Sequence, residues 1–164
     1  MDVPKESDIY KRLKTLGFEL PPAPPGLETF CLVRPMGNDL LYLSGLGPDI
    51  PGQKEIKGKL GTDVDIEEGQ LAARCTILNA LSVLHNYLGD LNRITGFIKL
   101  LVLVASDPSF YFQPQVANGA SELLLGVFGD TIGKSSRSAI GVAVLPQNIP
   151  VEIEMIIQYT SSGG

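Results

Sequence analysis

The sequence has few of the residues that build disulfide frameworks and metal centres. Its 164 residues include two cysteines, one histidine and no tryptophan. Small secreted domains are held together by several disulfide pairs, so Cys31 and Cys75 are expected to be reduced thiols. Together with His85 they do not supply the three or four ligands of a zinc site. The composition therefore predicts no metal ion.

Basic residues and long apolar runs are also scarce. Lys and Arg number 13 against 18 Asp and Glu, and the resulting net charge of -5 disfavours a polyanionic partner such as nucleic acid. The longest apolar stretch, residues 100–105, is too short to cross a bilayer. The N-terminus carries Asp2 and Glu6 instead of the basic and apolar regions of a signal peptide. We expect a cytoplasmic protein with no nucleic-acid or membrane partner.

What the sequence does contain favours one globular domain. Hydrophobic residues make up 44% and charged residues 19%, which is typical of a chain with its own core. Residues 1–27 are predicted to form a short helix, ending at Gly17, followed by a proline-rich linker. We interpret them as an appendage to a main domain over residues 28–160, with a disordered tail over 161–164.

The main domain has an α+β pattern. Strands are predicted over 29–34 and 40–44, joined by a turn at Gly37–Asp39. The pattern then predicts a short edge strand over 57–60, a long helix capped by Asp65 and Glu68 that ends at Gly89, a buried strand over 94–104, a helix over 114–127 that stops at Gly129, and two final strands over 138–145 and 151–159. Two helices cover only one face of such a mixed sheet, so we expect an oligomer that covers the other face.

Arg137 is the strongest candidate for binding a ligand. Period-two alternation places Arg137, Ala139 and Gly141 on one face of a strand, so an arginine heads a row of very small side chains. Such a row leaves space, and a guanidinium can bind a carboxylate through two parallel hydrogen bonds. The alternative is an interface salt bridge on a face kept small for close packing.

Acidic residues and the histidine are weaker candidates. Glu152 and Glu154 lie opposite the apolar side chains of the last strand, where they are either solvated or line a polar site. Spacing alone favours solvation. His85 lies late in the long helix, as a surface residue or a partner of the helix dipole, and we assign it no catalytic role.

Several segments together resemble one known family. The most specific are residues 136–146, SRSAIGVAVLP, and residues 151–154, VEIE; residues 37–45, GNDLLYLSG, and Asn118 add support. Over about residues 29–159 the chain resembles the YjgF/RidA proteins, also called L-PSP endoribonuclease-like. The best-supported activity of that family is hydrolysis of reactive enamines and imines.

The resemblance implies a fold, an assembly and a set of site residues. The fold is chorismate-mutase-like with two helices on one face of the sheet, and the assembly is a homotrimer with three clefts between subunits. The family's carboxylate-binding arginine corresponds to Arg137 and its acidic residue thought to handle water to Glu152. Its backbone-contact glycine corresponds to Gly45 and its cleft asparagine to Asn118. No cofactor is implied.

The chain also departs from the family pattern. Phe30 stands where better-characterised members carry a cleft tyrosine, and Ala139 stands where they carry a cysteine two residues after the arginine. The helix containing Asn118 is about one turn longer. These differences indicate a divergent subgroup. Because Phe30 and Ala139 occupy positions that correspond to cleft residues of the family, we expect both to contact the substrate.

Three functions remain open at this point. The favoured hypothesis is hydrolytic deamination of small 2-aminoacrylate-type enamines and imines to 2-keto acids and ammonia, with Arg137 holding the carboxylate and Glu152 orienting water. The alternative is a protein that binds small carboxylates without turnover. Endoribonuclease activity ranks last, because the chain is acidic and has no basic groove. If the last strand runs antiparallel, Glu152 starts it at the end remote from Arg137, so the working pair is expected to come from two subunits.

Overall fold

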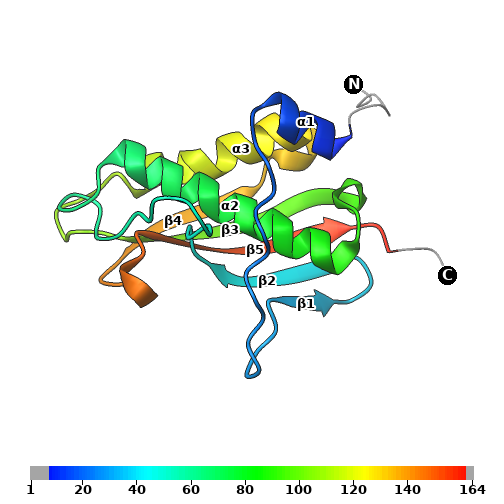
Figure 1. The fold of residues 1–164 in the computed structure, drawn as a ribbon, viewed down its shortest axis with the longest axis horizontal. Coiled ribbons are helices and arrows are strands. Elements are labelled where there is room, and N and C mark those ends of the chain that lie inside the picture. The colour runs from blue at the N-terminus through cyan, green and yellow to red at the C-terminus, as the bar shows by residue number, and fades with distance from the viewer. Residues whose placement is uncertain (1–7, 162–164) are drawn as a thin grey trace.

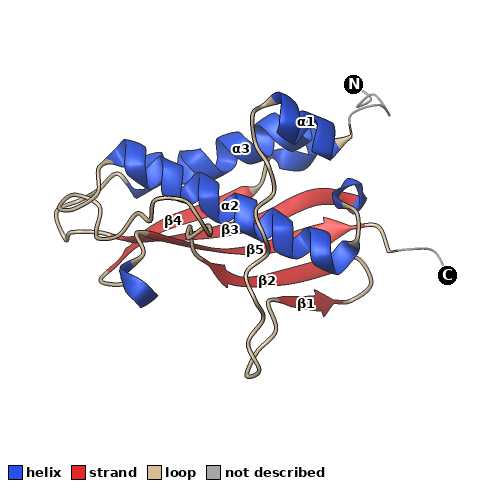
Figure 2. Ribbon diagram, in the orientation of Figure 1, coloured by secondary structure: helices blue, strands red, loops and turns tan. Residues whose placement is uncertain are grey.

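The chain folds around one five-stranded sheet. The computed structural model describes residues 8–161. In chain order the elements are α1 (Ile9–Thr15), β1 (Val33–Met36), β2 (Leu40–Leu46), α2 (Ile66–Leu88), a 3-10 turn η1 (Leu91–Arg93), β3 (Ile94–Ala105), α3 (Gln113–Gly133), β4 (Ser136–Val142), a second 3-10 turn η2 (Pro146–Asn148) and β5 (Val151–Tyr159). Both long helices lie across the same face of the sheet (Figures 1 and 2).

The strand order is β1-β2-β5-β3-β4. The β3–β4 pair is parallel, with α3 as its crossover, and the other pairs are antiparallel. The two C-terminal strands, β4 and β5, are therefore not neighbours, because β3 lies between them. This order decides where the side chains of β4 and β5 stand relative to each other.

The core lies between the sheet and the two long helices. Leu100, Val102 and Val104 of β3 are fully buried on this face, together with most of the inner side of α2. The opposite face keeps large apolar side chains exposed, such as Ile140 at 47% and Tyr42 at 38%. The prediction that two helices would cover one face of a mixed sheet is confirmed, and no described element covers the other face.

Most of the predicted elements are present. The hairpin of β1 and β2 is confirmed, although β1 covers 33–36 and not the predicted 29–34. The final strand β5 is confirmed, and Asp65 and Glu68 form the predicted capping box at the start of α2. Helix α3 is longer than predicted, but Gly129 interrupts its helical backbone at φ 75° and ψ 176°. The predicted edge strand over 57–60 was wrong, because Leu60 makes only isolated bridges to neighbouring segments.

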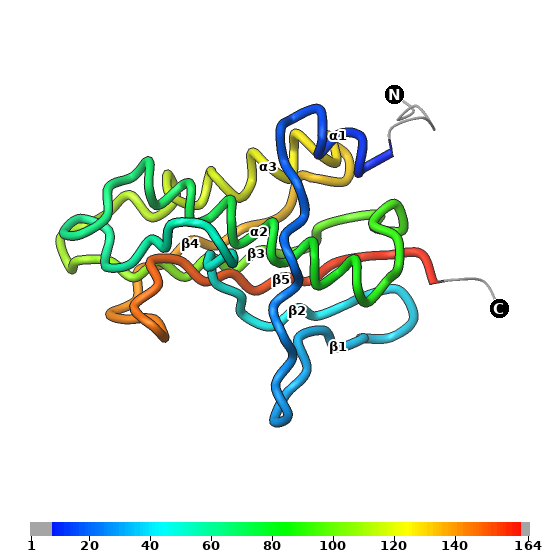
Figure 3. The backbone as a smooth tube through the Cα atoms, in the orientation of Figure 1, coloured from blue at the N-terminus to red at the C-terminus, as the bar shows by residue number. Residues whose placement is uncertain are grey.

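The N-terminal segment is part of the main core. Ile9 and Leu13 are buried against it, and Arg12 Nη1 donates to the carbonyl of Val127 at 3.2 Å. The Tyr10 hydroxyl is 2.8 Å from Nδ1 of His85. The extended chain that follows passes α2 on its way to β1 (Figure 3). The apolar face of α1 therefore docks on the domain, and the boundary placed at residue 27 stays a prediction.

Of the tail predicted over 161–164, residues 162–164 lie outside the described part of the chain. Within the described part, no helix has the length and apolar character needed to cross a membrane.

Candidate functional site

Arg137 stands on the helix-covered face of β4, beneath the first turns of α3. Its Nη1 donates to Oδ1 of Asn118 and to the hydroxyl of Ser121, each at 3.0 Å, and Nη2 donates to the carbonyl of Pro114 at 3.2 Å. These three acceptors are neutral and leave two of the five guanidinium donors for a ligand. Among residues 8–161 the salt bridges all involve Lys57, so no described carboxylate compensates the charge of Arg137.

Asn118 and Ser121 hold the guanidinium in place. They lie three residues apart on α3 and so face the same side of the helix. Asn118 was among the predicted residues, and the structure brings it together with Arg137. Ser121 was missed, because a serine in the middle of a helix gives no signal until the strand that it faces is known.

The small side chains after Arg137 leave less space than the sequence suggested. Ala139 is half-buried and packs against the core. A Cβ at Gly141 would lie 2.8 Å from Nε2 of Gln113 and 2.9 Å from the hydroxyl of Ser106, so this glycine lets α3 approach the strand. Part of the predicted open row is thus close packing within the chain.

Glu152 belongs to a different cluster, at the C-terminal end of β2. A cavity of about 520 Å³ is lined by Pro24, Leu27 and Phe30 of the chain before β1, residues 44–47 at the end of β2, Asp49, Asn79 of α2, and Pro146, Gln147, Ile149 and Glu152. It brings together three predicted residues, Phe30, Gly45 and Glu152. A Cβ at Gly45 would collide with Oε1 of Glu152 and lie 2.8 Å from its Cδ, so the glycine provides the space for this carboxyl group.

The environment of Glu152 disfavours the charged form of its carboxyl group. Burial raises the pKa of its carboxyl above the ordinary value for glutamate, and the nearby charge of Glu154 raises it further. Glu154 accepts a hydrogen bond of 2.6 Å from the Tyr42 hydroxyl, and this bond raises the pKa of Tyr42. Spacing had favoured solvation for both glutamates. The structure separates them, with Glu152 in the cavity and Glu154 paired on the open face.

The Arg137 and Glu152 clusters lie on opposite faces of the sheet. Arg137 pairs with Leu100 of β3, and Glu152 pairs with Leu103 of the same strand. These two β3 positions are three residues apart. Side chains an odd number of residues apart on a strand point to opposite faces, so Arg137 and Glu152 do too. Three residues of offset amount to about 10 Å along the strands, and the two strand spacings between β4 and β5 add about 10 Å across them. One chain therefore does not bring the two side chains to one small ligand.

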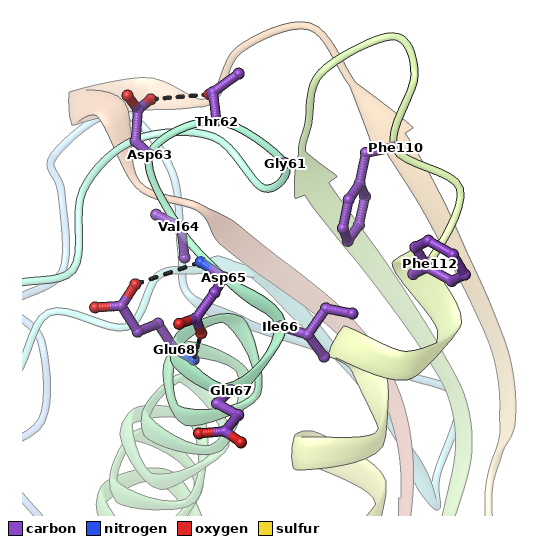
Figure 4. A pocket seen from close by; sticks show the side chains of 10 residues that line it. All are labelled: Gly61, Thr62, Asp63, Val64, Asp65, Ile66, Glu67, Glu68, Phe110 and Phe112. Carbon is purple, nitrogen blue, oxygen red and sulfur yellow. Dashed lines mark hydrogen bonds between the residues drawn. The ribbon is translucent and has the colours of Figure 1, made fainter.

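A second cavity, of about 700 Å³, lies at the N-terminal end of α2 and contains none of the predicted site residues. Phe110 and Phe112 line one side of it, across from Ile66 (Figure 4). Its polar groups are largely engaged with each other: Asp65 Oδ1 accepts from the backbone N–H of Glu68 at 2.8 Å, and Glu68 accepts from the N–H of Asp65 at 3.3 Å. Its acidic side chains thus serve mainly to begin the helix.

The thiols lie outside both clusters. Cys31 is exposed, and burial raises the pKa of the half-buried Cys75 thiol, which makes it a poor nucleophile. Across residues 8–161 no three His, Cys, Asp or Glu side chains gather in a way that would hold a metal ion.

Comparison with known proteins identifies the family. The family model described as "YjgF/chorismate mutase-like, putative endoribonuclease" matches residues 10–158. The chain belongs to this family. The mixed five-stranded sheet with two long helices on one face agrees with this membership. The match begins within α1, in agreement with the docking of that helix on the core.

Three relatives are similar over nearly their whole length. Protein TCP17 of Trypanosoma cruzi is 38% identical over 163 residues, which cover 98% of this chain and 100% of the relative. The crystal structure of Atu1372 from Agrobacterium tumefaciens, a protein of unknown function, is 40% identical with a TM-score of 0.84 and covers 93% of this chain and 92% of its own. A structure named a putative endoribonuclease, from Shewanella oneidensis, is 30% identical with a TM-score of 0.86 and covers 92% and 99%.

Proposed function

We propose that this YjgF-family chain is a hydrolase that converts small enamine and imine carboxylates of the 2-aminoacrylate type to 2-keto acids and ammonia. The observation that carries the proposal is the presence of two half-sites. One holds an uncompensated guanidinium, and the other holds a carboxyl group that can exchange protons. They face opposite sides of the sheet, so that neighbouring copies of the chain can combine them.

The Arg137 half-site suits a carboxylate. Its guanidinium is fixed by Asn118, Ser121 and a backbone carbonyl, none of which neutralises it. A preorganised guanidinium loses little freedom when it binds a planar anion. The carboxylate of a 2-imino acid would take the two remaining donors, which orients the neighbouring C=N carbon.

The Glu152 half-site suits the water chemistry. Hydrolysis adds water to the C=N carbon, moves a proton to nitrogen, and releases ammonia as the C=O bond forms. A carboxyl group whose pKa is raised by burial is a stronger base than an ordinary glutamate, and it can accept the proton of water and return it to nitrogen. Because imines already hydrolyse in water, a contribution of about 10²- to 10⁴-fold from acid-base catalysis suffices.

The two half-sites require a neighbour. A homotrimer, as the family resemblance implies, would cover the open face and bring Arg137 of one subunit to Glu152 of the next. Such an arrangement places the catalytic pair in a cleft between subunits, with Gly45 and Phe30 on the Glu152 side. Ala139 and Asn118 lie on the Arg137 side.

The experiment is a coupled assay of ammonia and keto-acid release. An amino-acid oxidase generates the 2-imino acid in situ, and the protein should accelerate its disappearance over the buffer rate. Arg137→Gln should abolish the acceleration, whereas Arg74→Gln, which changes an arginine of α2 that belongs to neither half-site, should keep it. A wild-type rate equal to the buffer rate would refute the proposal.

Phe30 supports a second candidate, a protein that binds small carboxylates without turnover. It lines the Glu152 cavity with no hydroxyl group to bond water or substrate. Calorimetry with a panel of small 2-keto and 2-amino acids distinguishes the two functions, since tight binding without ammonia release would favour the binding protein. The endoribonuclease function carried in the family description ranks third, because the net charge of -5 opposes an RNA backbone.

A further inference from the structure

The η2 turn between β4 and β5 has an unusual backbone. Within residues 8–161, Gln147 and Asn148 are the two non-glycine residues with positive φ. Gln147 has φ 55° and ψ 21°, and Asn148 has φ 58°. L residues rarely adopt this left-handed conformation, and asparagine tolerates it better than glutamine does. A glutamine at such a position favours a functional role for its side chain.

Contacts within the turn and with a distant loop hold this conformation. The N–H of Ile149 donates to the carbonyl of Pro146 at 3.2 Å across the turn, and the carbonyl of Asn148 accepts from the N–H of Gly58 at 2.8 Å. Ile149, which follows the turn, is 7% exposed. These contacts fix the position of Gln147 relative to the start of β5, where Glu152 lies.

Gln147 lines the cavity of about 520 Å³ that also contains Glu152, whereas Asn148 does not line it. Three other polar side chains of the wall bond to other parts of the chain, and they are Ser44, Asp49 and Asn79. Gln147 and Glu152 have no such partner among residues 8–161, and Gln147 is exposed. The rest of the wall consists of glycine and apolar side chains, namely Gly45, Gly47, Pro24, Leu27, Phe30, Leu46, Pro146 and Ile149.

We propose that Gln147 is a specificity-determining residue that binds the substrate's side chain and favours a carboxamide or hydroxyl group there. This proposal rests on the proposed function, in which Arg137 of a neighbour holds the carboxylate and Glu152 acts at the C=N carbon, leaving the side chain for the cavity wall. A carboxamide both donates and accepts, so Gln147 can form two hydrogen bonds with a carboxamide of the substrate. The apolar part of the wall offers that group no other partner.

Two imines of nearly equal shape provide the test. The 2-imino acids made by an oxidase from asparagine and leucine differ at the end of the side chain, which is a carboxamide or an isopropyl group, and the ratio of their kcat/KM values is measured. Gln147→Met keeps the side-chain length and the left-handed backbone but removes the carboxamide. It should lower the asparagine-to-leucine ratio by about three- to tenfold relative to wild type, the loss expected for one or two hydrogen bonds.

Variants within the same turn separate binding from backbone strain. Gln147→Gly removes the side chain and should lower the ratio as Gln147→Met does, yet it should unfold at no lower temperature than wild type, because glycine accepts positive φ. Asn148→Gly, at a residue of similar φ outside the cavity, is the matched control and should keep the ratio. A purely structural role of Gln147 would change the unfolding temperature and leave the ratio unchanged.

The outcomes separate this proposal from the proposed function. If both imines are hydrolysed but the Gln147 variants keep the wild-type ratio, the specificity role is refuted and the hydrolase stands. If no imine is hydrolysed, calorimetry with asparagine and leucine decides: weaker binding of asparagine by Gln147→Met, with leucine unaffected, supports the role of Gln147 although the hydrolase is refuted. Equal binding by wild type and variant, or no binding by either, refutes both.

Discussion

Under the proposed function, the sheet geometry predicts that each active site combines Arg137 of one subunit with Glu152 of another. Arg137 and Glu152 lie about 10 Å apart along the strands and a similar distance across them, on opposite faces. Arg137→Ala and Glu152→Ala should therefore each give an inactive homo-oligomer. Mixing the two variants should restore activity, because one interface can combine the native Arg137 of one subunit with the native Glu152 of another.

The size of the recovery follows from counting interfaces. With equal amounts and random exchange in a closed ring, about a quarter of the interfaces receive both native residues. The mixture should therefore reach about a quarter of the wild-type rate per subunit in the ammonia-release assay, after exchange has been verified with tagged subunits. A mixture that stays inactive after verified exchange would refute the composite site.

Three further perturbations test the remaining parts of the argument. Gly45→Ala should lower activity by about tenfold or more because the added Cβ displaces the Glu152 carboxyl, while Gly26→Ala, where a Cβ meets nothing within 4 Å, should leave the rate unchanged. Because the folded pKa of Glu152 is raised, the native state binds more protons than the unfolded chain between the two pKa values, so stability should fall as pH rises through that window. Denaturant unfolding at several pH values should show a smaller fall for Glu152→Gln, and an equal fall would contradict the burial argument. Ile140→Glu on the open face should give a smaller species in sedimentation at micromolar concentration, whereas Leu71→Glu on α2, a site of similar exposure, should not.

The sequence contained enough information to assign the faces of the strands. Alternation in β4 and β5 placed Arg137 and Glu152 on defined sides, and the structure agrees with both assignments. Local patterns also predicted the capping box at Asp65 and a break in the helix at Gly129, where the helix was expected to stop and instead resumes as far as Gly133. These features depend on contacts within a few residues along the chain.

Sequence patterns did not predict which residues lie next to the site residues. Alternation does not state which strand pairs with which, so nothing in it indicated that β3 would separate β4 from β5. The docking of α1 depends on contacts such as Tyr10 with His85, which are 75 residues apart. Asn79 is one of several polar residues in the sequence of α2, and its hydrogen bonds to the carbonyls of Gly47 and Asp49 become visible only with the loop after β2 in place.

Covering the open face and completing the site are linked through the same side chains. Leu101 and Leu103 of β3 are only half-buried in one chain and point to the side from which Glu152 projects. A neighbour that buries these leucines also removes water from around the Glu152 carboxyl, and loss of water raises the pKa of a carboxyl group. Burial within one chain has already shifted this pKa upward, so assembly would move it further in the direction that proton exchange near neutral pH requires. The hydrophobic surface that drives assembly would thereby tune the group that the assembled cleft uses.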